Sequence, residues 1–301
     1  MEVSSNTKIL IAGGNGFIGN YISKYLQDKY EICSIGYEEY SSYNYCKVDL
    51  TQLEEVIKYV KSLPVVGTLI FLTGLAHSKG KNKDYQEFYN INVNTLINLL
   101  TTLKDYNKLP SKIIFASTIS VYGENWKRET YDEKIRLSPK SPYARTKMEA
   151  EKYLLENYKN NSWILRFSPV YADNFMLNID RRTIIKNKFY CVGDGKAKLS
   201  LLNIQNIKKV IHSIIENKVP SGVYNLADKK TYNYLDLLEF QNAEKIIHIP
   251  KFIMYLLYKL GQLIRINYLI ENSIKLSTNN IFIPDKIHKF INLDKELRNV
   301  K

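Results

Sequence analysis

Two side chains that could cooperate in proton transfer, Tyr143 and Lys147, stand four residues apart. This spacing places a phenol and an ammonium on one face of a helix, about one turn apart. A phenol with a pKa of about 10 is a weak base at neutral pH. A neighbouring ammonium stabilises the phenolate, and so does the positive end of a helix dipole. Ser141 and Pro142 are typical of a helix start, so Tyr143 is predicted to lie at that positive end as an acid and base.

A glycine-rich turn near the N-terminus strengthens this interpretation, because the Tyr-Lys pair alone arises by chance in a chain with 24 tyrosines. An apolar run over 8–12 is typical of a buried strand, and a helical pattern follows it. Glycines let the backbone turn tightly and approach a pyrophosphate at the helix start. A glycine-rich turn without a ligand is the alternative. The position after the first strand favours dinucleotide binding. The expected cofactor-binding residues are Gly13, Gly16, Phe17, Ile18 and Gly19.

Strands and helices are predicted to alternate through the first half of the chain. Expected strands cover 8–12, 31–35, 68–72, 112–116 and 162–166, and expected helices cover 16–28, 51–61, 84–106 and 142–158. This alternation implies parallel strands joined by crossovers, and hence a doubly wound sheet of the α/β class. Ligands of such sheets bind beyond the carboxyl ends of the strands. The glycine turn, Thr73-Gly74 and Ser117-Thr118 each follow a strand, so we expect them to meet at one edge.

Beyond about residue 172 the alternation becomes less regular. Later elements are expected at 198–203, 205–217 and 223–226. The strand near 222–227 is expected to return to the main sheet, because it ends in another turn on the ligand side. We therefore predict a dinucleotide-binding domain over residues 1–172 and a smaller C-terminal α/β substrate cap that forms most of 173–301.

Composition limits the functional classes. A chain of 301 residues can form one large or two modest domains. Three cysteines in no paired spacing fit a reducing compartment without a disulfide framework. The N-terminal residues show no signal-peptide pattern, so a cytoplasmic location is expected. No metal site is expected, because the four histidines are scattered: His77, His212, His248 and His288.

The formal net charge of +13 indicates an anionic partner only where cations cluster. Here they are spread along the chain, so we expect solvated faces and no nucleic-acid partner. An anionic diphosphate substrate or a membrane surface is the alternative. The apolar run over 252–258 is far shorter than the ~20 residues of a membrane span. A helix packed within the cap is the favoured interpretation, and an interfacial amphipathic helix with basic flanks is the alternative.

In order and spacing, these motifs resemble the extended short-chain dehydrogenase/reductase family, in its NAD-dependent nucleotide-sugar epimerase/dehydratase branch. The resemblance covers nearly the whole chain. It includes the glycine turn, Asn92-Val93-x-Thr95, Ser117-Thr118-x-Ser120-Val121-Tyr122-Gly123, Tyr143 with Lys147, and Leu165-Arg166-Phe167-x-Pro169-Val170-Tyr171. It implies a Rossmann domain, a nicotinamide cofactor, a nucleotide-sugar substrate, and a homodimer formed through the helices near 84–106 and 142–158.

The resemblance also implies roles for individual residues. Tyr143 would take the proton of a sugar hydroxyl while hydride leaves its carbon for the nicotinamide. Lys147 would tune Tyr143 and bind the nicotinamide ribose, and Thr118 would hydrogen-bond the reacting oxygen. The alternatives are an exposed turn aspartate for Asp49 and a backbone-capping hydroxyl for Thr118. Further implied cofactor-binding residues are Asp49, Leu50, Leu72 and Gly74.

Departures from the family pattern bear on the cofactor and the reaction. Family members that use NAD usually carry an acid near the end of the second strand, where this chain has Tyr37. No lysine or arginine lies between Lys29 and Lys47 to neutralise a 2′-phosphate, so NAD is favoured over NADP. Ile119 and Ser120 replace the Asp-Glu pair of the family's 4,6-dehydratases, which argues against dehydration.

Leu199 and Asn206 stand where simple 4-epimerases of the family commonly have Arg and Asp. The local sequence is more similar to enzymes of surface-polysaccharide pathways that act on N-acetylated sugars, many of them 4-reductases or 4-epimerases. We therefore expect a nucleotide-sugar oxidoreductase acting at C4, either a 4-epimerase or a 4-keto reductase. The alternatives are the same chemistry on a lipid-diphosphate-linked sugar at the membrane surface, and a non-catalytic dinucleotide-binding sensor.

Overall fold

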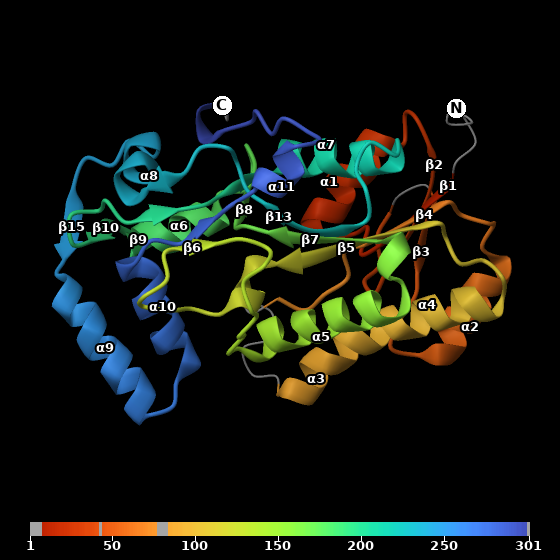
Figure 1. The fold of residues 1–301 in the computed structure, drawn as a ribbon, viewed down its shortest axis with the longest axis horizontal. Helices are drawn as coiled ribbons and strands as arrows, with labels where there is room; N and C mark the ends of the chain where they lie inside the picture. The colour runs from red at the N-terminus through yellow and green to blue at the C-terminus, as the bar shows by residue number, and fades with distance from the viewer. Residues whose placement is uncertain (1–7, 42–43, 77–83, 300–301) are drawn as a thin grey trace. The chain divides into compact units, whose positions relative to one another are not determined.

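A parallel sheet forms the centre of the fold in the computed structural model, which describes residues 8–41, 44–76 and 84–299. Within these residues, seven strands pair in the order β3-β2-β1-β4-β5-β7-β13 (Figure 1). The pairings among the first five are all parallel. The strands are β1 Lys8–Ala12, β2 Glu31–Gly36, β3 Tyr45–Lys47, β4 Thr68–Phe71, β5 Lys112–Thr118, β7 Ser162–Phe167 and β13 Gly222–Leu226. The predicted doubly wound α/β sheet is confirmed.

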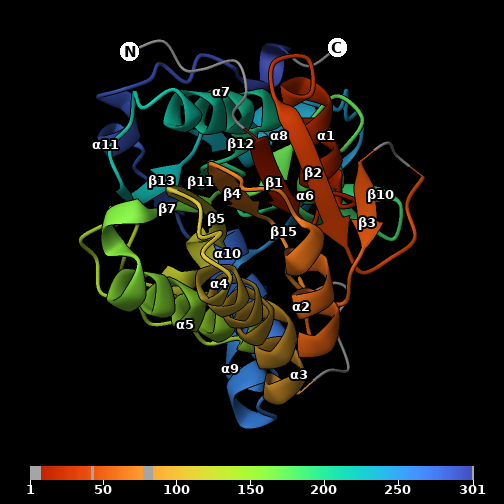
Figure 2. The same ribbon diagram turned by 90° about the vertical axis from the view of Figure 1, so that its right-hand side faces the viewer.

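Helices cover both faces of the strands. Figure 2 shows α2, α4 and α5 on one face and α1 on the other. Four fully buried leucines at i, i+3, i+4 and i+7 give α4 its apolar face: Leu96, Leu99, Leu100 and Leu103. The helices are α1 Phe17–Leu26, α2 Leu53–Ser62, α3 Tyr85–Tyr89, α4 Thr95–Asp105 and α5 Pro142–Asn157.

The single helix expected over 84–106 is interrupted, which corrects the prediction. It begins with a capping box, in which the Asp84 and Glu87 carboxylates each accept the other residue's backbone N–H. A π-helical turn then covers Asn90–Asn94 and separates α3 from α4. Such turns insert an extra residue and are frequent at functional sites. The helical period of apolar residues in the sequence does not show where this π-helical turn lies.

The chain groups into two compact units, each described here by itself. Unit 1 comprises Met1–Thr118, Pro142–Leu165 and Val210–Val223, and unit 2 comprises Ile119–Ser141, Arg166–Lys209 and Tyr224–Lys301. The chain thus crosses between the units several times. The division expected from the sequence, with residues 1–172 and the strand near 222–227 in one domain and most of 173–301 in a cap, stays a prediction. Which unit binds cofactor and which binds substrate stays a prediction.

Unit 2 contains several small sheets. β10 pairs with β15 in parallel and with β9 in antiparallel orientation. The strand expected over 198–203 is divided into β11 and β12, because the Ser200 backbone N–H and hydroxyl bond instead to Asn280 and Phe282. β11 pairs with β14, β12 with β8, and β16 with β6. These strands are β6 Thr130–Tyr131, β8 Val170–Tyr171, β9 Ile184–Ile185, β10 Lys188–Val192, β11 Lys198–Leu199, β12 Leu202–Asn203, β14 Tyr232–Asn233, β15 Ile246–Ile249 and β16 Ile281–Phe282.

The helices of unit 2 lie between and beside these strands. One of them, α7, continues from unit 2 into unit 1 at residue 210. The helices are α6 Leu177–Thr183, α7 Ile204–Ile215, α8 Tyr234–Phe240, α9 Lys251–Leu263, α10 Asn267–Ser277 and α11 Asp285–His288.

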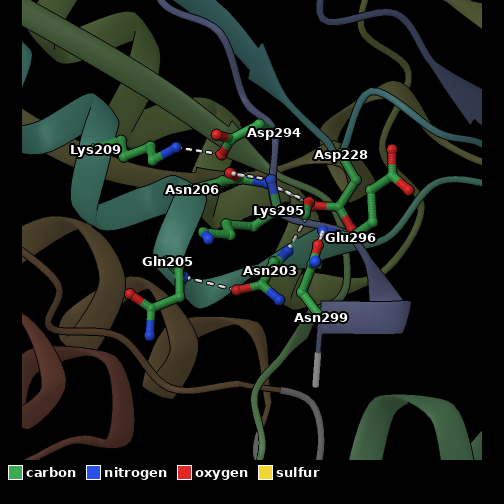
Figure 3. A network of polar contacts seen from close by, with 9 residues as sticks. All are labelled: Asn203, Gln205, Asn206, Lys209, Asp228, Asp294, Lys295, Glu296 and Asn299. Carbon is green, nitrogen blue, oxygen red and sulfur yellow. Dashed lines mark hydrogen bonds and ion pairs between the residues drawn. The ribbon is translucent and has the colours of Figure 1, made fainter. Parts of the chain in front are cut away.

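A buried carboxylate, that of Asp228, connects distant segments of unit 2. Four donors reach its oxygens at 2.6–3.0 Å: the Asn203 backbone N–H, the Asn206 amide, and the hydroxyls of Tyr171 and Tyr232. Burial raises the pKa of Asp228 to about 6. Asn206 extends the network by donating to the Lys295 carbonyl at 2.8 Å (Figure 3). This network ties the C-terminal segment to the start of α7.

Candidate functional site

The glycine turn and the turn after β4 lie against each other in unit 1. β1 and β4 are parallel neighbours, so their carboxyl ends lie at the same edge of the sheet. Gly13 has a φ of +86°, and a Cβ there would lie 2.8 Å from the Thr73 backbone nitrogen and 2.9 Å from the Leu72 carbonyl carbon. Only glycine satisfies both the dihedral angle and the close approach.

The rest of the glycine turn has the shape that a pyrophosphate requires. A Cβ on Gly19 would lie 2.1 Å from the Gly13 carbonyl oxygen, so α1 packs directly on the turn. A Cβ on Gly16 would meet only one atom of the described protein, the Gly13 oxygen at 3.3 Å. Gly16 is the N-cap of α1, and Phe17 and Ile18 open the helix. An open approach to the positive end of a helix fits the phosphates of a dinucleotide.

Tyr143 lies in the first turn of α5 and shares a side-chain hydrogen bond with Thr118. β5 runs two residues further than expected, so Thr118 ends the strand. Burial raises the pKa of the Tyr143 phenol to about 12, and the hydrogen bond with Thr118 lowers it in part. From the sequence we expected the ammonium of Lys147 to favour the phenolate. In the structure desolvation dominates, and the pKa moves in the opposite direction.

Lys147 is almost completely buried beside the same strand ends. Its Nζ lies 4.0 Å from the centroid of the Phe115 ring, and a Cβ on Gly74 would lie 3.8 Å from it. Burial lowers the pKa of the Lys147 ammonium to about 7, and the carboxylate of Glu151 raises it. Glu151 is 1% exposed and accepts a hydrogen bond from the Ser117 hydroxyl. The sequence interpretation missed Glu151, although its spacing of four residues from Lys147 was a usable signal.

Asn92 connects the turn after β4 to α5. Its Oδ1 accepts the Leu75 backbone N–H at 2.6 Å, and its Nδ2 donates to the Thr146 hydroxyl at 3.0 Å. Asn92 is fully buried and lies in the π-helical turn, which directs its side chain inward. Because Thr146 directly precedes Lys147, this amide fixes the position of α5 relative to the cofactor edge. The motif Asn92-Val93-x-Thr95 was noted in the sequence analysis, but the connection that Asn92 makes between the turn after β4 and α5 was not predicted.

Asp49 and Leu50 form a separate turn after β3. Asp49 Oδ1 accepts the backbone N–H and the hydroxyl of Thr51, at 2.9 and 2.7 Å. Leu50 is buried, and its carbonyl oxygen accepts from the Asn98 amide at 3.0 Å. These contacts are those of a turn aspartate, the alternative considered above. Contact of Asp49 and Leu50 with the cofactor stays a prediction.

From the sequence we expected no cation near the end of β2, but the structure places Lys47 there. Lys47 pairs in register with Gly36, the last residue of β2. The sequence interpretation considered only the stretch between Lys29 and Lys47, and Lys47 itself lies eleven residues after Gly36. Its ammonium forms an ion pair with Glu39, at 3.0 Å. Tyr37 follows Gly36 and is 68% exposed.

Two further findings concern metals and membranes. Among residues 8–41, 44–76 and 84–299, no three or more His, Cys, Asp and Glu side chains are grouped so as to hold a metal ion. His77 and the residues before Lys8 lie outside the described residues. In the described chain, every helix is too short or too polar to span a bilayer.

A doubly wound sheet whose glycine turn lies beside a buried lysine and a tyrosine-threonine contact defines a class of Rossmann-type, dinucleotide-dependent enzymes. Residues 9–227 match the family model described as the NAD dependent epimerase/dehydratase family, and the chain belongs to this family. The family is NAD(P)-dependent, and this chain is an enzyme of this family.

Individual relatives are distant. A dTDP-D-glucose 4,6-dehydratase of Dictyostelium discoideum is 27% identical over 286 residues, which are 80% of this chain and 62% of that protein. The chain thus matches less than two thirds of that relative's length. The fold is similar to that of an ADP-L-glycero-D-manno-heptose-6-epimerase of Helicobacter pylori, with a TM-score of 0.74, 16% identity and coverage of 97% and 93%. It is also similar to that of a Thermus thermophilus UDP-glucose 4-epimerase in complex with NAD. The TM-score is 0.70 and the identity 18%, and the match covers 97% of this chain and 96% of that chain.

Proposed function

We propose that this enzyme is an NAD-dependent nucleotide-sugar oxidoreductase acting at C4, either a 4-epimerase or a 4-keto reductase. The observation that carries the proposal is the hydrogen bond between Thr118 and Tyr143, one helical turn from the buried Lys147. Thr118 ends β5, and the glycine turn follows β1, a parallel strand of the same sheet, so both lie at the same edge of the sheet. We place the enzyme in the cytoplasm, in the synthesis of surface polysaccharide sugars.

The side chains divide the work of moving one proton. Tyr143 takes the proton of the sugar hydroxyl at its phenol oxygen and returns it in the reverse step. Thr118 hydrogen-bonds the same sugar oxygen and so fixes its position between the two side chains. A nicotinamide dinucleotide, when bound, supplies the acceptor and donor of hydride. The raised pKa of Tyr143 makes the phenol a strong base once ionised, and a charged Lys147 is required to ionise it near neutral pH.

Two features of the chain argue against other functions, the first against a dehydratase and the second against a non-catalytic sensor. Ile119 and Ser120 follow Thr118, and neither side chain can act as the acid or base that elimination of water requires. The full set of threonine, tyrosine and lysine also argues against a non-catalytic sensor, because a sensor has no need of a buried lysine beside a tyrosine. Both features involve residues close to the end of β5, since Ile119 and Ser120 follow Thr118 and Tyr143 is hydrogen-bonded to it.

The preference for NAD is also part of the proposal. Lys47 lies beside the end of β2, where a 2′-phosphate would bind, but its charge is paired with Glu39. Glu38 and Glu39 follow Tyr37 and oppose a second anionic group. We expect the purified enzyme to bind NAD at least tenfold more tightly than NADP, as measured by isothermal titration calorimetry. Equal affinities would contradict this preference.

A panel of UDP-, GDP- and dTDP-sugars tests the proposed function. With NAD at a concentration well below that of the sugar, an epimerase converts the sugar to its C4 epimer without net change in absorbance at 340 nm. A reductase consumes NADH in proportion to a 4-keto sugar. Tyr143→Phe serves as the matched control for contaminating activity. Binding of NAD without turnover of any member of the panel would contradict the proposed catalytic role.

A lipid-diphosphate-linked sugar is the second candidate substrate, and the exposed apolar side chains of α9 favour it. Activity on such a sugar in detergent or bilayers, with none on the free nucleotide sugars, would select this candidate. We also propose a homodimer that pairs through α4 and α5. Light scattering coupled to size-exclusion chromatography tests it, and a monomer at micromolar concentration would contradict it.

A further inference from the structure

Exposed apolar side chains gather on one helical hairpin of unit 2. Nine of the nineteen large apolar side chains that are exposed in the described chain lie between residues 252 and 268. Of the residues of α9, only Met254 and Gly261 are buried. The apolar run therefore packs much less than the favoured sequence interpretation implied. A contiguous exposed apolar surface on a water-soluble domain marks an interaction site.

The helices α9 and α10 pack against each other to form the hairpin. Figure 1 shows α9 and α10 side by side. Gly261 allows their close approach, since a Cβ there would lie 3.0 Å from the Leu269 Cβ and 3.1 Å from the Ile270 nitrogen. Arg265 has a φ of 56° and turns the chain between the two helices. Trp126 packs against two rings of α9, with centroids 6.4 Å from Tyr255 and 5.2 Å from Tyr258, and most of the other residues of α9 are exposed.

One outer stripe of α9 is apolar along its whole length. Four side chains at i, i+4, i+8 and i+11 share one face of a helix of 3.6 residues per turn. Their exposed fractions are high: Phe252 64%, Leu256 59%, Leu260 45% and Leu263 80%. Tyr255, 51% exposed, and Tyr268, 74% exposed, add aromatic rings whose hydroxyls suit the boundary between water and hydrocarbon.

The charges within the hairpin segment 251–270 have one sign, whereas the exposed Asp194 outside it interacts with Lys251. Residues 251–270 contain Lys251, Lys259 and Arg265 and no aspartate or glutamate. Glu271, the first acid beyond them, is 9% exposed and paired with Lys275, so it does not balance the cations at the surface. Lys259 falls on the apolar face itself, with its Nζ 5.5 Å from the Tyr255 ring centroid. A lysine in this position extends its ammonium past the apolar side chains toward an anionic layer.

We propose that the α9–α10 hairpin is a docking surface for an anionic lipid bilayer, on which the enzyme lies as a peripheral protein. An apolar stripe with lysine and arginine on and beside it is the pattern of helices that lie in the membrane interface. A second copy of the chain is a poor occupant, because a two-fold contact would bring Lys259 and Arg265 against the same cations, and residues 251–270 supply no acid to pair with them. The net charge of +13 adds attraction at longer range.

Co-sedimentation with vesicles tests the proposal on the full chain. We expect the parent protein to bind vesicles of phosphatidylglycerol and phosphatidylcholine at low salt, and to bind vesicles of phosphatidylcholine alone at least tenfold less. Leu256→Glu with Leu263→Glu should reduce binding to the anionic vesicles about tenfold or more, because two carboxylates enter the apolar stripe. Neutralising Lys251, Lys259 and Arg265 with glutamine should reduce it about a hundredfold, since each cation near the surface contributes about 1 kcal/mol.

Matched variants separate this surface from general charge and hydrophobicity. Val65→Glu with Ile247→Glu places the same two charges at exposed apolar positions elsewhere, 71% and 45% exposed. Glutamine at the exposed Lys58, Lys104 and Lys159 lowers the net charge by the same three units. Both control variants should bind like the parent. Thermal unfolding confirms that each variant is folded.

Three outcomes would overturn the proposal. The first is no binding of the parent protein to anionic vesicles at low salt. The second is equal loss of binding in the hairpin and control variants. The third is a dimer in solution that Leu256→Glu with Leu263→Glu dissociates, since the face would then be an interface between copies. None of these readouts involves catalysis, so they test the surface independently of the proposed reaction.

Discussion

Lys147 holds its amine in an apolar environment, with the Phe115 ring on one side and Gly74 close by. Burying an ammonium is unfavourable unless it is paired, which is why its pKa falls to about 7. An active site commonly retains such a group at a cost in stability. At the scale of single residues, Lys147 and its neighbour Glu151 therefore make the most direct predictions.

Replacing Lys147 should stabilise the fold while removing activity. The native pKa of Lys147 lies below its unfolded value of about 10.4. Between about pH 7 and pH 10 the unfolded chain binds more protons, so the stability of the parent rises with pH in this window. Lys147→Met should be about 1–3 kcal/mol more stable than the parent at pH 7. The stability of Lys147→Met should also no longer increase between about pH 7 and pH 10.

Urea unfolding at pH 7 and pH 9.5, without dinucleotide, measures both effects. A Lys147→Met variant less stable than the parent at pH 7, with the same pH dependence, would contradict this account. Turnover assays on the same samples should show the loss of activity.

Removing the charge of Glu151 should change the pH profile of the enzyme. The Glu151 carboxylate raises the pKa of Lys147, so Glu151→Gln should lower it. The alkaline limb of kcat/KM should then move to lower pH, by about one unit. Glu156→Gln is the matched control, because Glu156 lies on the same helix but is exposed and paired with Lys152. An unchanged profile in Glu151→Gln would remove this residue from the control of Lys147.

At the scale of elements, the glycine turn separates ligand binding from folding. Gly13 requires glycine for the fold itself, because of its φ of +86° and its contact with Thr73. Gly16 has a negative φ and only one close neighbour, so alanine fits there within the protein. Its Cβ would instead enter the space through which we expect a pyrophosphate to approach.

Alanine at these two positions should therefore give different results. Gly16→Ala should leave the free energy of unfolding within about 1 kcal/mol of the parent and weaken NAD binding at least tenfold. Gly13→Ala should lower the free energy of unfolding by more than 1 kcal/mol as well. Chemical denaturation and calorimetric titration measure the two quantities. Normal NAD affinity in Gly16→Ala would place the pyrophosphate elsewhere.

Elements with a strong period were predictable from the sequence, and those set by tertiary contacts were not. β1, β4 and α5 end within a residue or two of their expected positions, because buried runs and helix-start residues mark them. The π-helical turn at Asn90–Asn94 was missed, since an inserted residue leaves the apolar spacing nearly unchanged. The proximity of Lys47 to the end of β2 was missed because parallel pairing joins residues eleven positions apart.

The candidate site could be predicted in part for the same reason. Thr118, Tyr143 and Lys147 follow a strand or open a helix, so topology alone brings them to one edge. The direction of the pKa shifts could not be predicted, because desolvation depends on side chains such as Phe115 that pack from another element. Asn92 and Glu151 carry no chemistry in isolation. Their roles follow only from the partners that the fold gives them.

At the scale of the whole molecule, Asp228 connects segments of unit 2 that are far apart in the sequence. Its oxygens receive hydrogen bonds from segments near residues 171, 203 and 232, and Asn206 connects them to Lys295 (Figure 3). Asp228→Ala should leave several buried donors without an acceptor and lower the free energy of unfolding by about 3 kcal/mol or more. Asp236→Ala, a helix-capping carboxylate in the same unit, should cost about 1 kcal/mol.

Chemical denaturation of the two variants compares the buried network with the half-buried helix cap. A smaller loss in Asp228→Ala than in Asp236→Ala would show that the network contributes little to stability. Hydrogen exchange should in addition show faster exchange of the Leu297 amide in Asp228→Ala, because that amide donates to the Tyr232 hydroxyl.

The central claim is that the phenol of Tyr143 carries the proton in a dinucleotide-dependent reaction on a sugar. Single-turnover hydride transfer in Tyr143→Phe, with the best substrate of the sugar panel, tests it most directly. We predict a rate at least about a thousandfold below the parent, with NAD affinity changed by less than about threefold. A near-normal rate in the folded variant, with NAD bound, would contradict the account.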